Sequence, residues 1–141
     1  MRATLMYGAG DVRVQDVPDP AVLEPTDAVV RILRAAVCGS DLWPYGSMRP
    51  AEQGRPMGHE FLGIVSELGS GVSGLKVGDL VVASFLWQDN TCDLSRKGLQ
   101  SSCRHGGRYG FGDVGGGQAE AIRVPQAEGA CRYCRPETEV M

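Results

Sequence analysis

The stretch Gly58-His59-Glu60-Phe61-Leu62-Gly63 carries the most information about this chain, and it continues through an apolar run to Gly69 and Val72. Upstream of it lies Cys38-Gly39-Ser40-Asp41. Together the two stretches supply a thiol, an imidazole, a hydroxyl and carboxylates. Catalytic zinc sites have three protein ligands of these kinds and leave the fourth position to water or substrate. The two stretches therefore predict a zinc site with one open position.

The composition is that of one globular domain rich in glycine. Of 141 residues, 20 are Gly and 8 are Pro, which predicts many turns and an irregular β domain. The net charge of -3 gives no electrostatic reason to bind nucleic acid or an anionic membrane. The chain has no apolar run of membrane-spanning length, and its N-terminus lacks the apolar core of a signal peptide. We therefore expect a cytoplasmic protein with neither nucleic-acid nor membrane partners.

Alternating apolar and polar residues predict short strands separated by turns. The expected strands cover residues 2–7, 12–17, 28–37, 59–68, 80–84 and 118–124. The turn Gly8-Ala9-Gly10 predicts that the first two strands form a hairpin. Ser40 is expected to cap a short helix over residues 40–45, and residues 48–56 are expected to form a loop. This order of short strands predicts a small, partly open barrel.

The two stretches resemble the zinc-dependent alcohol dehydrogenases of the medium-chain dehydrogenase/reductase superfamily. The family signature Gly-His-Glu-x-x-Gly-x5-Gly-x-x-Val is matched here at every defined position, from Gly58 to Val72. The resemblance extends from residue 1 to about residue 126. It implies a mainly β domain over residues 1–128. The implied fold is a GroES-like (chaperonin-10-like), partly open β-barrel with short helices and an irregular cysteine-containing lobe over about residues 86–117.

The resemblance also implies a role for each polar residue of the two stretches. Cys38 and His59 would bind the catalytic zinc, with Glu60 next to the metal or as an alternate ligand. Ser40, Asp41 and Glu60 are the expected catalytic residues. Ser40 would hydrogen-bond the alcohol and start a proton relay, while Asp41 would orient the imidazole. The implied reaction passes hydride from a zinc-activated small alcohol to NAD or NADP, or the reverse.

The cysteine-containing lobe departs from the family pattern. An odd number of cysteines, five in this chain, favours free thiols or metal ligands over a closed disulfide framework. Relatives often hold a structural zinc with C-x2-C-x2-C-x7-C, and the matching residues here are Asp89, Cys92, Ser95 and Cys103. Two interpretations stay open. Asp89, Cys92 and Cys103 form a degenerate zinc site, or packing and hydrogen bonds hold the lobe and leave two free thiols.

No nucleotide-binding domain is expected within the chain. Two Gly-x-Gly-x-x-Gly matches, at residues 69–74 and 110–115, are not followed by the helix that a dinucleotide site requires. The first match is expected to be a turn between strands. Residues 129–141 no longer resemble the family and are expected to be disordered.

The missing domain leaves two functional hypotheses open. Hydride transfer requires the cofactor, so the chain is expected to be inactive by itself. A non-enzymatic zinc-binding or interaction module on the same barrel is therefore the alternative. Full-length relatives are implied to be homo-oligomers, and the state of this chain stays open.

Overall fold

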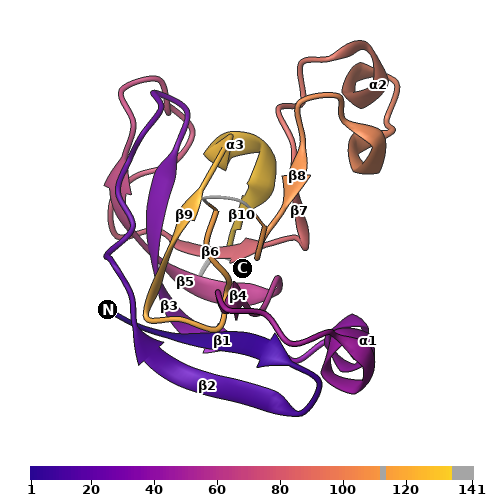
Figure 1. Ribbon diagram of the computed structural model, residues 1–141. Coiled ribbons are helices and arrows are strands. Elements are labelled where there is room, and N and C mark those ends of the chain that lie inside the picture. Colours follow the sequence, from indigo (N-terminus) through magenta and orange to yellow (C-terminus); the bar gives the residue numbers. More distant parts are fainter. Residues whose placement is uncertain (112–113, 135–141) are drawn as a thin grey trace, which may run out of the picture.

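The fold is described by a computed structural model that covers residues 1–111 and 114–134 and consists mainly of strands (Figure 1). Strands β1 (Arg2–Gly8) and β2 (Asp11–Asp16) form the predicted hairpin. Gly10 takes a φ of 72° in its turn, a conformation that glycine adopts without a steric penalty. Strand β4 (Arg55–Pro56) pairs with β1, giving the sheet order β2-β1-β4. The loop predicted over residues 48–56 is therefore wrong at its end.

A five-stranded antiparallel sheet forms the larger part of the domain, with the order β10-β6-β5-β3-β9. Its strands are β3 (Ala28–Ala35), β5 (Phe61–Leu68), β6 (Leu80–Ala83), β9 (Ala121–Val124) and β10 (Cys131–Tyr133). Four of these confirm predicted strands, although each is shorter than predicted. Side chains that alternate toward one face build the core, including Val30, Phe61, Val65, Val81, Ile122 and Val124. The two sheets do not close into a full barrel.

Helix α1 (Gly39–Ser47) follows β3 and lies beside the β1–β2 hairpin (Figure 1). The prediction that Ser40 caps this helix is wrong, because the N-cap residue is Cys38. The Asp41 carboxylate accepts a hydrogen bond from the Cys38 backbone N–H at 2.9 Å, which satisfies one of the donors at the helix start. Ser40 instead lies inside the first turn. Within the described part of the chain, no helix is both long enough and apolar enough to cross a membrane.

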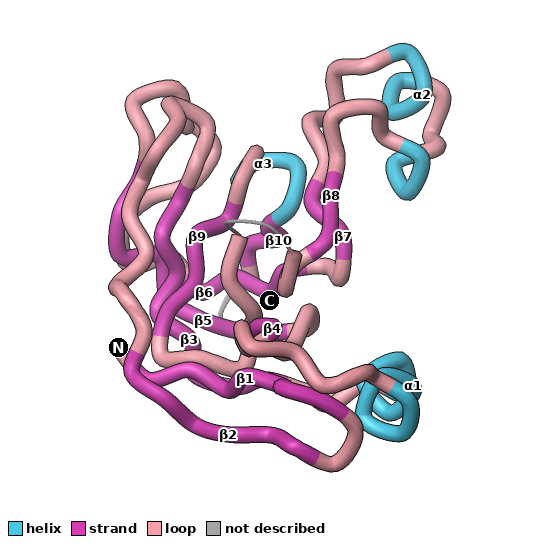
Figure 2. The backbone as a smooth tube through the Cα atoms, viewed as in Figure 1, coloured by secondary structure: helices cyan, strands magenta, loops and turns pink. Residues whose placement is uncertain are grey.

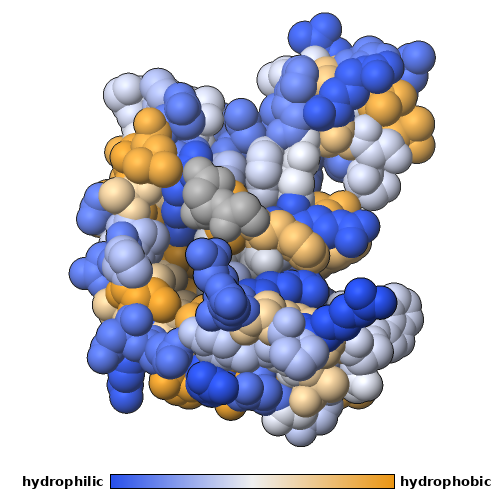
Figure 3. Space-filling model, viewed as in Figure 1, coloured by the Kyte–Doolittle hydropathy of each residue, from blue (hydrophilic) through white to orange (hydrophobic). Residues whose placement is uncertain are grey.

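The lobe predicted over residues 86–117 projects from the sheets, and loops make up most of it (Figure 2). Its regular elements are β7 (Leu86–Trp87), α2 (Asp93–Arg96), the 3-10 helix η1 (Gln100–Ser102) and β8 (Gly107–Arg108). The pairing of β7 with β8 forms its base. In the space-filling view the lobe stands apart from the body of the domain and presents largely hydrophilic residues (Figure 3).

The segment after residue 128 is ordered as far as residue 134, so the prediction of a disordered tail over 129–141 is wrong for this part. Helix α3 (Ala127–Ala130) leads into β10, whose Cys131 pairs with Ala83 of β6. Ala130 and Cys131 are buried in the core, and burial raises the pKa of the Cys131 thiol to about 12. Residues 135–141 lie outside the described residues.

The glycine-rich turn between β5 and β6 binds a carboxylate of the chain itself. Glu128 on α3 accepts hydrogen bonds from the Gly74 N–H, from the Ser73 N–H at 2.6 Å and from the Ser73 hydroxyl at 3.1 Å. The Gly74 and Ser73 N–H groups lower the pKa of Glu128. The turn expected over residues 69–74 is thus confirmed, and its donors serve the packing of α3.

Replacing Glu128 by glutamine is expected to lower the thermal unfolding midpoint by a few degrees at pH 7. A carboxylate with a lowered folded-state pKa stabilises the fold fully above its unfolded pKa of about 4.3, and this contribution is lost as the pH falls further. The difference between wild type and Glu128→Gln should therefore shrink below about pH 4. Thermal melts of both proteins at pH 7 and below about pH 4 measure this difference in unfolding midpoint. The control is Glu67→Gln, which removes an exposed carboxylate from β5. A pH-independent difference would contradict the assignment.

Candidate functional site

The pairing of β3 with β5 brings the two polar stretches together. Ala35 near the end of β3 lies opposite Phe61 at the start of β5. Cys38 follows the first strand and His59 and Glu60 precede the second, so all three lie at the same end of the sheet. One ligand atom from each of these three residues lies within 4.8 Å of the other two. The structure therefore groups the three residues that the sequence suggested for the first zinc site.

Asp41 and Ser40 contact opposite nitrogens of the His59 ring. Asp41 is nearly buried, and its Oδ1 lies 3.6 Å from His59 Nδ1, longer than a hydrogen bond but close enough to orient the ring. Its Oδ2 is the acceptor for the Cys38 N–H. Ser40 Oγ lies 3.2 Å from His59 Nε2. The Asp41 carboxylate thus positions the Cys38 backbone through one oxygen and the His59 ring through the other.

Two further features shape the surroundings of His59. Gly58 has a φ of 89°, and a Cβ there would lie 2.5 Å from the backbone nitrogen of Gln118, so only glycine fits before the histidine. Phe85 is half exposed and faces the His59 ring edge-on, with 6.5 Å between ring centroids. Phe85 and Glu60 also line an open groove of about 530 Å³. The sequence analysis missed Phe85, because nothing in its local spacing relates it to the histidine.

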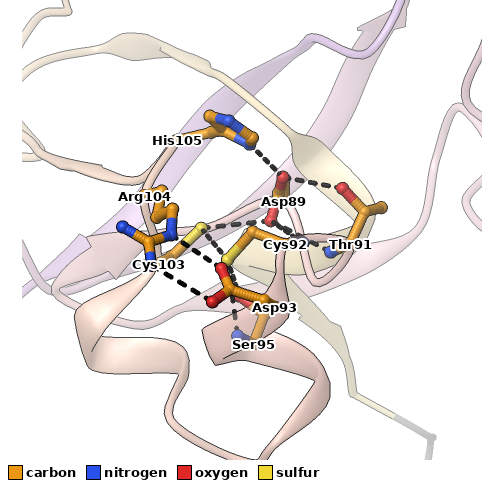
Figure 4. A network of polar contacts seen from close by, with 8 residues as sticks. All are labelled: Asp89, Thr91, Cys92, Asp93, Ser95, Cys103, Arg104 and His105. Carbon is orange, nitrogen blue, oxygen red and sulfur yellow. Dashed lines mark hydrogen bonds and ion pairs between the residues drawn. The ribbon is translucent and has the colours of Figure 1, made fainter.

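The four lobe positions that match the family's cysteine pattern also lie together (Figure 4). Asp89, Cys92 and Cys103 each place one ligand atom within 4.8 Å of the others. The two sulfur atoms are 3.8 Å apart, and the Cys103 thiol donates to Asp89 Oδ1 at 3.1 Å. Ser95 contacts Cys92 Sγ twice, through its hydroxyl at 3.2 Å and its N–H at 3.4 Å. Serine therefore serves here as a hydrogen-bond partner of the neighbouring sulfur.

His105 is a member of the lobe network that the sequence analysis missed, because it lies outside the four-position pattern. Its Nδ1 is 2.6 Å from Asp89 Oδ2, and the Thr91 hydroxyl donates to the same oxygen at 2.7 Å (Figure 4). The contacts with His105, Thr91 and Cys103 hold the pKa of Asp89 well below its usual range, and Asp89 in turn raises the pKa of His105.

The sulfur of Cys92 is surrounded by donors. The Ser95 hydroxyl and then the Ser95 N–H lower the pKa of Cys92 to about 6. The neighbouring ion pair between Arg104 and Asp93, with 2.7 Å from Nε to Oδ1, is exposed and closes the polar network of the lobe (Figure 4).

The two clusters differ in how well they suit a metal ion. Zinc binds sulfur, imidazole nitrogen and carboxylate oxygen at about 2.0–2.3 Å. The first cluster offers one of each, from Cys38, His59 and Glu60, and the Asp41 carboxylate supports the imidazole from its other side. The second cluster offers two sulfurs and one carboxylate. Its fourth position is Ser95, whose hydroxyl is not a usual zinc ligand. The donor set of the first cluster therefore fits catalytic zinc, whereas that of the lobe is incomplete as a structural site.

The chain matches the model of the family described as the alcohol dehydrogenase GroES-like domain over residues 24–137. It is 37% identical to the zinc-type alcohol dehydrogenase B of Aspergillus flavus over 92% of this chain and 30% of that protein. The match confirms the expected GroES-like fold. It also includes residues 129–137, which the sequence analysis had placed outside the family pattern.

Solved structures agree with this match. An alcohol dehydrogenase from Thermus sp. ATN1 superposes with a TM-score of 0.89 and 38% identity, over 96% of this chain and 40% of that chain. A zinc-binding dehydrogenase of Sinorhizobium meliloti bound to NADP superposes with a TM-score of 0.69 and 27% identity, over 97% of this chain and 39% of that one. The chain spans about a third of the length of the curated relatives it matches.

Proposed function

The chain belongs to the alcohol dehydrogenase family through its GroES-like domain, and from this premise we propose that it supplies the zinc site of an oxidoreductase. The proposed reaction exchanges hydride between a small alcohol or carbonyl substrate and NAD or NADP. The observation that carries the proposal is the convergence of Cys38, His59 and Glu60 from two separate segments. In this proposal the residues of the chain bind the metal and position the substrate oxygen.

Cys38 and His59 would hold the zinc ion, with Glu60 as the adjacent carboxylate. Zinc, when bound, supplies a Lewis acid that polarises an alcohol or carbonyl oxygen. Asp41 is a positioning residue: it holds the Cys38 N–H and faces His59 Nδ1, so a metal would bind at Nε2 in place of the Ser40 Oγ contact. Such carboxylate–imidazole contacts fix the tautomer and raise the basicity of the ligand.

Ser40 is the proposed proton-transfer residue. Its hydroxyl lies on the Nε2 side of the imidazole, where it can take a proton from a substrate hydroxyl during oxidation as it passes its own hydroxyl proton to water, and reverse both transfers during reduction. Phe85, which faces the His59 ring and lines the groove with Glu60, provides an apolar surface that suits the carbon skeleton of an alcohol. The glycine-rich turn at residues 69–74 donates to Glu128, so we do not assign the nicotinamide cofactor to it.

The test is metal binding by the reduced chain in a background that removes both lobe thiols, Cys92→Ser/Cys103→Ser. This background should bind one zinc or cobalt(II) ion, and cobalt(II) should show the absorption of a thiolate complex. Adding Cys38→Ser or His59→Ala should weaken zinc binding by more than about 100-fold, and Asp41→Asn by about 10–100-fold. Competition with a chromophoric chelator measures these affinities.

Cys134→Ser is the matched control, because its thiol lies beyond β10 and away from both clusters. It should leave zinc affinity unchanged. Unchanged affinity in Cys38→Ser and His59→Ala would overturn the zinc assignment. Zinc binding by the full-length enzyme, with no alcohol-dependent reduction of NAD or NADP, would instead favour the non-enzymatic module.

A further inference from the structure

We propose that Cys92 and Cys103 form a reversible disulfide when the chain meets a peroxide, so that the lobe can be closed by a covalent bond without a metal ion. All five cysteines are free thiols in the structure. The lobe pair is distinctive because its sulfurs already contact each other at 3.8 Å. The inference does not depend on the proposed dehydrogenase function.

The backbone places both sulfurs at element ends that face each other. Cys92 is the N-cap of α2, and Cys103 directly follows η1 as its C-cap. The two elements pack together within the lobe. A disulfide has an S–S distance of about 2.05 Å, so the sulfurs need to approach by less than about 2 Å. Cys92 is buried and Cys103 is partly exposed, which gives an oxidant access to the pair from one side.

The contacts around the pair favour this bond over a metal. Ser95 occupies the third position of the family's four-cysteine pattern and directs both its hydroxyl and its N–H at Cys92 Sγ. Asp89 uses one oxygen for the Cys103 thiol and the other for His105. A metal ion would have to replace the Asp89–Cys103 contact and would still have only three protein donors. The Cys92 and Cys103 thiols therefore lack the protection from oxidation that a zinc ion bound by four cysteines would give them.

The oxidation balances with hydrogen peroxide as the only co-reactant. The partly exposed Cys103 sulfur attacks one peroxide oxygen, the O–O bond breaks, and the products are a Cys103 sulfenic acid and one water, which takes the thiol proton that Cys103 shares with Asp89. The Cys92 sulfur then attacks Cys103 Sγ, which forms the S–S bond and expels hydroxide. The Cys92 thiol proton converts this hydroxide to a second water. Two thiols are oxidised, one peroxide is reduced, and a dithiol reductant reverses the step.

The test is peptide mapping of the full chain after chelation, reduction and treatment with stoichiometric hydrogen peroxide. Trypsin cleaves after Lys76, Arg96, Lys97 and Arg104, so Cys92 and Cys103 fall in separate peptides, residues 77–96 and 98–104, with no other cysteine in either. The expected product is the linked pair, lighter than the sum of the two peptides by two hydrogen masses. Most of the signal from the free peptides should be lost, and dithiothreitol should restore it.

Single substitutions separate the disulfide from general oxidation. Cys92→Ser and Cys103→Ser should each abolish the linked pair, while Cys134→Ser should leave it intact, with circular dichroism showing that all three remain folded. The proposal is overturned if peroxide converts Cys103 or Cys92 to sulfinic acid without a link, or if either thiol pairs with another cysteine. It is also overturned if the chain as purified carries one zinc per lobe that prevents the link.

Discussion

Replacing Arg123 by methionine is expected to destabilise the domain by about 3–5 kcal/mol, because it leaves a buried carboxylate without its cation. Arg123 on β9 donates from Nε to Asp27 Oδ2 at 2.7 Å, and the Asp27 side chain is only 1% exposed. The same oxygen accepts the N–H groups of Leu23 and Glu24 from the turn before β3. The ion pair therefore fixes the start of the strand that leads to the proposed zinc site.

An exposed ion pair in the same fold provides the matched control. Arg2 pairs with Glu120 at 2.9 Å, but the two side chains are 70% and 50% exposed. Exposed pairs of this kind contribute about 0–1 kcal/mol, so Arg2→Met should have a small effect. Denaturant unfolding of the two variants measures both free energies. Equal losses would show that burial of Asp27 does not determine the strength of its contact.

Much of the fold could be predicted because its longer strands are rich in apolar residues and are separated by turn residues, and β5 alternates between buried and half-buried positions over its first five residues. The predictions failed where an element was too short to show a period. The two residues of β4 and the three of β10 are defined by their partners β1 and β6 in the structure, and partners cannot be read from local sequence. The helix N-cap was wrong for a similar reason, because it depends on the Asp41 carboxylate reaching back to the Cys38 N–H.

The site could be predicted only as far as the motif extended. Cys38, His59 and Glu60 belong to two motif stretches, and the structure brings them together; their binding of zinc stays a proposal. Phe85 and His105 belong to no motif, and only the fold places them beside His59 and Asp89. Motif spacing identifies the residues that belong to a motif. Neighbours that come from other segments, such as Phe85 and His105, can be identified only from the three-dimensional structure.

The glycines of the signature have a structural role distinct from that of its histidine. A Cβ at Gly69 would lie 2.3 Å from the backbone oxygen of Pro25, and one at Gly63 would lie 2.4 Å from that of Arg31. Real Cβ atoms do not approach backbone oxygens so closely. Together with the constraint at Gly58, these contacts show that the motif combines the two residues proposed to bind zinc, His59 and Glu60, with positions where backbones meet. This combination explains how one short stretch can specify both fold and site.

Gly63→Ala is accordingly expected to destabilise the domain by about 3 kcal/mol, the upper range for overpacking in a core. Gly63 lies opposite Ile32, where the β3–β5 register shifts. Its new methyl group would meet the Arg31 backbone oxygen and, at 2.6 Å, Val30 Cγ1. Relief would require the two central strands to separate, which also moves His59 away from Cys38. Urea unfolding measures the loss, and zinc affinity should fall with it.

The control for Gly63→Ala is Gly46→Ala, because Gly46 lies on exposed α1 and its added Cβ would meet nothing within 4 Å. Alanine should stabilise that helix by up to about 1 kcal/mol, through its better helix propensity and the smaller entropy of the unfolded chain. A lower free energy of unfolding for Gly63→Ala and a higher one for Gly46→Ala would show that close packing requires glycine at position 63. A stable Gly63→Ala variant with wild-type zinc affinity would mean that β3 and β5 can separate without disturbing the site, contrary to the contact at Arg31.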